Sequence, residues 1–153
     1  ELFNTKNRSK SFDFVFNNVH SDLEASCVVD MAAYSGEVTP VQVSYGGKTG
    51  MMRMAAISSS DFHTKATKGN LQLQSQPKDD AVQTVTISFK SNQSSATAYL
   101  NYIELLVPCS LFLAPYSLLL DPFKPLSKNC FKAKYTPTPT KIPTKAPQRT
   151  SPT

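Results

Sequence analysis

Hydrophobic and polar residues alternate along most of the first part of the chain. In SFDFVFNNV, Phe12, Phe14 and Phe16 occupy every second position. This period of two predicts a half-buried strand with an aromatic inner face. Similar alternation occurs in five further stretches, SCVVDMAAY, VTPVQVSY, LQLQS, VQTVTISFK and ATAYLNYIEL. No stretch of twelve residues up to position 106 has a helical period.

Polar and glycine-rich turns separate these stretches. Gly46-Gly47 predicts a tight turn, and Pro40 indicates an edge strand or a strand start. The stretch MMRMAAI fits a strand, although its Met and Ala content also allows a short helix. About seven short strands with a turn every ten or so residues are typical of an antiparallel sandwich or jelly roll. We therefore expect an all-β, antiparallel β-sandwich or jelly-roll-like domain.

Composition changes sharply near residue 106. Residues 1–106 hold nine Lys/Arg, ten Asp/Glu and all five Gly, whereas residues 107–153 hold seven Lys/Arg, one acid and nine of the eleven Pro. The second part is first rich in Leu and Pro and then in Thr, Pro and Lys, a composition that cannot bury enough apolar surface to fold. We expect a β-sandwich domain at 1–106 and a low-order tail at 107–153.

The charge and hydropathy of that second part say little about partners. The sequence pI of about 9.1 reflects the tail, so it gives no reason to expect a nucleic-acid partner. Residues 105–120 are uncharged, but they are fewer than the ~20 that a membrane-spanning helix needs and include two prolines. We therefore expect no transmembrane span.

The residue types that carry catalysis are scattered. Cys27, Cys109 and Cys130 form no CxxC pair and no metal-ligand spacing. Cys27 lies in a strand-like stretch, where it is expected to be a small buried apolar residue. His20 and His63, the two histidines, lie in loop-like stretches without a spacing that pairs them with a nucleophile. The sequence therefore predicts no catalytic, cofactor-binding or metal site, no cofactor and no enzyme activity.

Three other motifs contain residue types that occur in binding sites. Asp79-Asp80 lacks the loop pattern of a calcium site and is expected to be a solvated turn. SYGGKTG lacks the spacing of a phosphate-binding loop. Tyr99 and Tyr102 could form part of a sugar-stacking platform. Strict alternation would place them on opposite faces of the strand, which weakens that interpretation.

The strand motifs, taken in order, resemble a known family. FDFVFNNV, AAYS, VQVSYGG, TVTISF and AYLNYIEL are similar to the region ahead of the peptidase domain in PorU-type sortases, the gingipain-related enzymes of the Bacteroidetes type IX secretion system. The most specific motif is AYLNYIEL at 98–105, with Asn101 where the family usually has Asp. The resemblance covers roughly residues 1–106.

This resemblance implies an accessory role. The chain would be a non-catalytic β-sandwich that packs against a downstream Cys/His peptidase domain, with the secretion system's cargo or components as further partners. The location would be the cell envelope, at the outer-membrane surface or in the periplasm. None of the family's catalytic residues can be placed on this chain.

The end and the start of the chain add two expectations. The family pattern stops after YIEL, where LVPCSLFLAPYSLLL follows. This change indicates a frame-shifted or mispredicted gene end, with a lineage-specific linker as the alternative. The start at Glu1, without Met or a signal peptide, indicates a fragment or a mature product. A second function, from another functional class, is the alternative to the accessory role. In this alternative the chain is a cell-envelope carbohydrate-binding β-sandwich.

Overall fold

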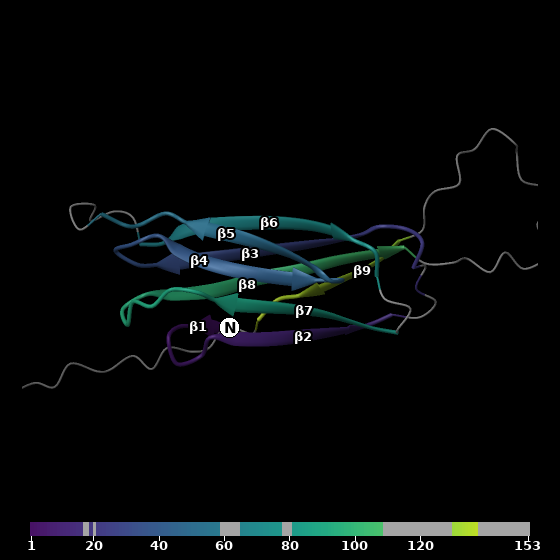
Figure 1. The fold of residues 1–153 in the computed structure, drawn as a ribbon, viewed down its shortest axis with the longest axis horizontal. Coiled ribbons are helices and arrows are strands. Elements are labelled where there is room, and N and C mark those ends of the chain that lie inside the picture. The colour runs from purple at the N-terminus through teal and green to yellow at the C-terminus, as the bar shows by residue number, and fades with distance from the viewer. Residues whose placement is uncertain (17–18, 20, 59–64, 78–80, 109–129, 138–153) are drawn as a thin grey trace, which may run out of the picture.

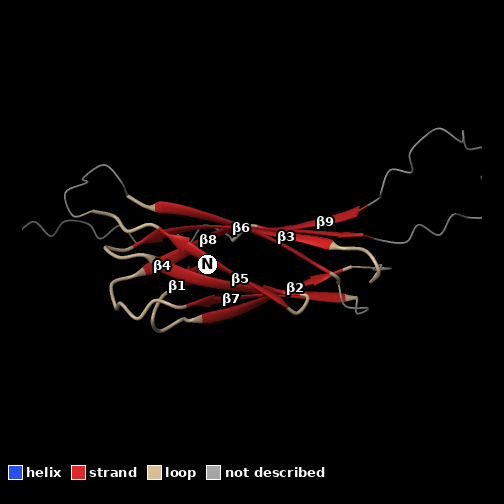
Figure 2. Ribbon diagram, turned by 45° about the horizontal axis from the view of Figure 1, so that its top comes forward, coloured by secondary structure: helices blue, strands red, loops and turns tan. Residues whose placement is uncertain are grey.

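The computed structural model describes residues 1–153 except 17–18, 20, 59–64, 78–80, 109–129 and 138–153. The described residues form nine β-strands and no helix. The strands make two antiparallel sheets that pack face to face (Figures 1 and 2). The all-β, antiparallel sandwich predicted from the alternation is therefore confirmed.

The strand order identifies the type of sandwich. Sheet A contains, in order, β1 (Leu2–Phe3), β8 (Thr97–Pro108), β3 (Ala25–Tyr34) and β6 (Thr67–Ser75). Sheet B contains β2 (Ser9–Val15), β7 (Val82–Phe89), β4 (Thr39–Tyr45) and β5 (Lys48–Met54). The strands pair in a nested order along the chain, β1 with β8, β2 with β7, β3 with β6 and β4 with β5. This is the connectivity of a jelly roll.

The hairpin between β4 and β5 follows from two glycines. Gly46 and Gly47 have φ angles of 57° and 81°, which only glycine adopts without strain, and they connect the paired residues Tyr45 and Lys48. The predicted tight turn is thus confirmed. Pro40 is the second residue of β4, in agreement with the predicted strand start. The stretch MMRM belongs to strand β5 and not to a helix.

Alternate residues of both sheets point inward and form one core. From sheet A these include Cys27, Val29, Met31, Leu100, Ile103 and Leu105, and from sheet B Phe12, Phe14, Val41, Val43, Tyr45, Met52, Val85, Ile87 and Phe89. The sheets also approach closely along the edge where β5 lies beside β6. A Cβ atom on Gly50 would lie 2.8 Å from the Leu73 side chain, and one on Gly69 would collide with the Met52 side chain. Glycine at these two positions therefore allows β5 and β6 to pack closely against each other.

A ninth strand lies where the sequence predicted a low-order tail. Strand β9 (Cys130–Tyr135) pairs with β8 from Ile103 to Pro108, and β8 itself extends two residues beyond position 106. Tyr135 packs on Phe12 of sheet B, with ring centroids 4.9 Å apart, and its hydroxyl donates to a carboxylate oxygen of Glu1 (3.2 Å).

This strand departs from the expected tail for a physical reason. The free edge of β8 offers unpaired backbone groups, and the edge of the core beside Phe12 offers apolar surface. The backbone of β9 pairs with that edge, and its side chains Ala133 and Tyr135, which alternate with two lysines, pack on the core. For the other residues of 107–153, the low-order tail stays a prediction.

Candidate functional site

Strand β8 contains a β-bulge at its centre. Met31 of β3 pairs with Leu100, but the preceding residue Asp30 pairs with Tyr102, so Asn101 is an additional residue on β8. The side-chain amide of Asn101 donates to a carboxylate oxygen of Asp30 at 2.6 Å. This hydrogen bond holds the bulge against the neighbouring strand.

The bulge reverses the alternation of β8. Ala98 and Leu100 point into the core before it, whereas Ile103 and Leu105 do so after it. Tyr99 and Tyr102 therefore point to the same outer surface of sheet A, although three positions separate them. The expectation that they point to opposite faces is wrong, because it assumed an unbroken alternation.

The two tyrosines differ in their surroundings. The Tyr99 side chain is 48% exposed and lies beside Leu2, its cross-strand partner on β1. Tyr102 is half-buried, and Nζ of Lys134 lies 4.5 Å from the centre of its ring. Tyr99 therefore offers a free aromatic ring, and Tyr102 a ring that carries a cation above it.

A third tyrosine lies on the same surface. Tyr34 is 57% exposed and pairs with Thr97, two residues before Tyr99, so Tyr34 and Tyr99 are diagonal neighbours across β3 and β8. We call Tyr34, Tyr99 and Tyr102 the tyrosine face. The sequence analysis missed Tyr34, although the alternation in SCVVDMAAY already places it on the side of Asp30 and opposite Cys27.

Polar groups surround the tyrosine face. The outward side chains of the neighbouring strand β6 are Lys68, Asn70, Gln72 and Gln74. The Gln72 amide donates to the hydroxyl of Ser26 at 3.0 Å, and Glu104 forms an ion pair with Lys132 at 2.9 Å. Amides that flank exposed aromatic rings can exchange hydrogen bonds with a polar ligand that stacks on those rings.

Cys27 is a core residue, as expected. Its side chain is fully buried on the inner face of β3, and burial raises the pKa of the thiol from 9.0 to about 12. A thiol that stays protonated is a poor nucleophile. Cys130 lies in β9. Five other residues that the sequence singled out lie outside the described residues: His20, His63, Asp79, Asp80 and Cys109.

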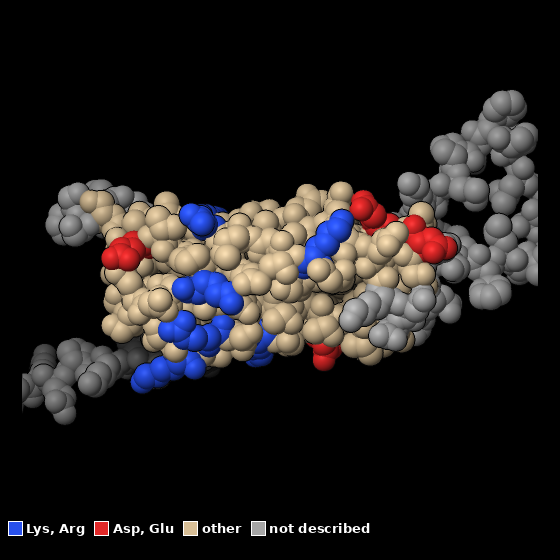
Figure 3. Space-filling view, viewed as in Figure 1, with Lys and Arg blue, Asp and Glu red and all other residues tan. Residues whose placement is uncertain are grey.

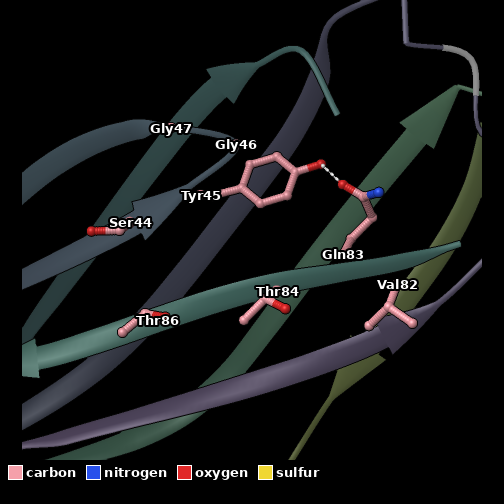
Figure 4. A pocket seen from close by; sticks show the side chains of 8 residues that line it. All are labelled: Ser44, Tyr45, Gly46, Gly47, Val82, Gln83, Thr84 and Thr86. Carbon is pink, nitrogen blue, oxygen red and sulfur yellow. Dashed lines mark hydrogen bonds between the residues drawn. The ribbon is translucent and has the colours of Figure 1, made fainter. Parts of the chain in front are cut away.

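The SYGGKTG stretch borders a notch in sheet B. The notch has a volume of about 240 Å³ and lies between the Gly46-Gly47 turn and the start of β7 (Figure 4). The Tyr45 hydroxyl donates to Oε1 of Gln83 at 3.4 Å, and Thr84 donates to Asp13 at 2.7 Å. These polar groups already bond within the protein, and no aromatic ring lies open in the notch. It is therefore a weaker candidate site than the tyrosine face.

Two further searches were confined to the described part of the chain. Within it, no group of three or more His, Cys, Asp or Glu side chains is arranged to hold a metal ion. The same residues contain no helix that is both long and apolar enough to cross a membrane.

Comparisons with known proteins give one structural likeness. No protein-family model matches the chain, and no curated protein matches it. A solved structure of the carbohydrate-binding module CBM36 in complex with calcium and xylotriose is similar, with a TM-score of 0.45 and 17% sequence identity. The match covers 68% of this chain and 77% of that chain.

Proposed function

We propose that this jelly roll is a non-catalytic carbohydrate-binding module that binds sugar on its tyrosine face. The observation that carries the proposal is the bulge at Asn101, which places Tyr99 and Tyr102 on one surface, beside Tyr34. Exposed aromatic rings are costly to leave in water and stack readily on the apolar faces of ligand rings. The two exposed rings of Tyr34 and Tyr99, with the half-buried ring of Tyr102 beside them, suit a chain of sugar rings.

The polar groups around the rings support the same ligand class. A sugar ring stacked on Tyr99 would present its hydroxyl groups sideways, toward the neighbouring strands. The amide of Asn70 lies on that side, on β6 beyond β3 and in line with Tyr102. Amides both donate and accept hydrogen bonds, as hydroxyl groups require.

A glycan-binding screen followed by calorimetry tests this proposal. Tyr99→Ala and Tyr34→Ala should each weaken binding of the strongest glycan about three- to tenfold, since each removes one stacking ring. Met51→Ala is the matched control, because Met51 is 46% exposed on the opposite sheet. The proposal fails if no glycan binds, or if all three variants bind like the unchanged protein.

A second candidate follows from the sequence resemblance. The most specific family motif, AYLNYIEL, forms β8, and beside it Leu2, Tyr34 and Tyr99 expose apolar surface. We propose as the alternative that this surface packs on the peptidase domain of a PorU-type sortase. The DNA downstream of the coding region should then encode a gingipain-like peptidase with a Cys and a His. The absence of such a reading frame would exclude this alternative.

A further inference from the structure

Three cationic residues lie in a row at one end of sheet B. Arg53 on β5 is the cross-strand partner of Pro40 on β4. The backbone N–H of Lys90 donates to the carbonyl of the same Pro40 at 2.9 Å, and the N–H of Phe89 donates to the carbonyl of Arg8 at 2.7 Å. Arg53, Pro40 and Lys90 thus lie in one row across β5, β4 and the end of β7, and Arg8 lies next to that row on the β2 side, opposite Phe89. At the usual strand spacing, this cation row is roughly 15 Å long.

The charges of the cation row are not neutralised by the described residues. All three residues are exposed, and none forms an ion pair with a carboxylate in the described part of the chain. The Arg8 guanidinium donates only to neutral groups, the carbonyl of Thr5 (3.2 Å) and the side-chain oxygen of Asn92 (3.4 Å). Lys and Arg side chains gather at this end of the face, whereas its middle is largely uncharged (Figure 3).

The surface next to the cation row carries hydroxyl groups, and beyond them along β2 and β7 the outward pairs are Asp13 with Thr84 and Val15 with Val82. Ser9 contacts Ser88 at 3.1 Å and Ser11 contacts Thr86 at 2.9 Å, in consecutive outward pairs of β2 and β7. No aromatic side chain points outward from the strands of sheet B. The outer surface of sheet B therefore offers charge and hydrogen bonds but no stacking, which is the reverse of the tyrosine face.

We propose that the outer surface of sheet B is a second binding site, and that its ligand is an acidic polysaccharide. The carboxylate or sulfate groups of successive sugars would pair with Arg53, Lys90 and Arg8, and the sugar hydroxyls would meet the Ser and Thr side chains. Arginine suits this role because its guanidinium can donate two parallel hydrogen bonds to one oxyanion. Single-stranded nucleic acid is disfavoured, because its bases stack on aromatic side chains that this surface lacks.

Affinity measurements on the full chain test this proposal. The probes are polygalacturonate, which carries carboxylates, and dextran sulfate, which carries sulfates, with neutral dextran for comparison. Arg53→Gln/Lys90→Gln should weaken binding of at least one acidic probe about tenfold at about 0.15 M salt. Lys6→Gln/Lys65→Gln removes the same charge from exposed positions outside the strands of sheet B and should change the affinity less than about twofold.

Three results would overturn the proposal. The first is equal weakening by the two double variants, which would show dependence on net charge alone. The second is no acidic probe bound, or binding that Arg53→Gln/Lys90→Gln leaves unchanged. The third is that DNA binds as tightly as the acidic polysaccharides and is lost in the same variant. Tyr99→Ala should leave this binding intact, so the outcome is independent of the tyrosine face.

Discussion

Asn101 lies where the inward positions of β8 change from even to odd residue numbers. Ala98 and Leu100 precede the change, and Ile103 and Leu105 follow it. This phase change is visible in AYLNYIEL itself, since two apolar positions three residues apart cannot both be inward on a regular strand. The hydrogen bond from Asn101 to Asp30 is not visible there, because it depends on a strand 71 residues away.

Replacing Asn101 by aspartate tests the bulge contact. In Asn101→Asp, a second carboxylate would face Asp30 in place of the amide at 2.6 Å. We expect the free energy of unfolding at neutral pH to fall by about 1–2 kcal/mol.

Urea unfolding at neutral pH, with Asn101→Ala as control, measures this effect. The alanine variant loses the hydrogen bond without gaining a charge, so its free energy of unfolding should fall by about 1 kcal/mol, less than that of Asn101→Asp. A loss in Asn101→Asp no larger than that in Asn101→Ala would contradict the account of the bulge.

The buried thiol of Cys27 makes a second prediction, on alkaline stability. The pKa of this thiol is 9.0 when it is exposed, and burial raises the pKa to about 12 in the fold. The neutral buried thiol therefore contributes fully to the free energy of unfolding below pH 9, and this contribution is lost as the pH rises toward 12. Under reducing conditions, unfolding at about pH 10.5 should show a loss about 2 kcal/mol larger in the unchanged protein than in Cys27→Ala. Equal losses would indicate that the thiol is not shielded from water.

Strand β9 shows the limit of reading elements from composition. Its six residues, CFKAKY, lie in a segment whose Pro and Lys content predicts low order. The strand forms because β8 offers a free edge and because Phe12 offers a ring for Tyr135, and both belong to distant parts of the chain. Six strands of the sandwich, β2, β3, β4, β6, β7 and β8, in contrast carry their own alternation and could be predicted one by one, whereas the two residues of β1 could not.

Tyr135 provides a test of whether β9 stabilises the fold. Tyr135→Ala removes the ring from Phe12 and the hydroxyl from Glu1, and it should lower the free energy of unfolding by about 2 kcal/mol. Tyr135→Phe keeps the ring contact and loses only the partly buried hydrogen bond to Glu1, so it should cost about 1 kcal/mol or less. If thermal unfolding shows no loss in either variant, β9 does not contribute to the stability of the sandwich.

The two outer surfaces of the sandwich differ in character. Sheet A has three tyrosines flanked by amides, and sheet B has hydroxyl groups and the cation row. The sandwich itself follows from the alternation along the chain. The cross-strand neighbours of each outward residue could not be predicted from the sequence, because they depend on the register of strand pairing. Tyr34 and Tyr99 become neighbours only through the pairing of β3 with β8, and Arg53 and Lys90 only through Pro40.

The most direct test of the tyrosine face is a residue-resolved NMR titration with the strongest ligand from the glycan screen. The account predicts that ring signals of Tyr34, Tyr99 and Tyr102 shift together with one dissociation constant, while those of Tyr45, buried in the core, stay in place. The absence of tryptophan leaves the tyrosine signals uncrowded. Shifts confined to the notch beside Gly46, or no shift in any of the three rings, would contradict the claim that this face binds carbohydrate.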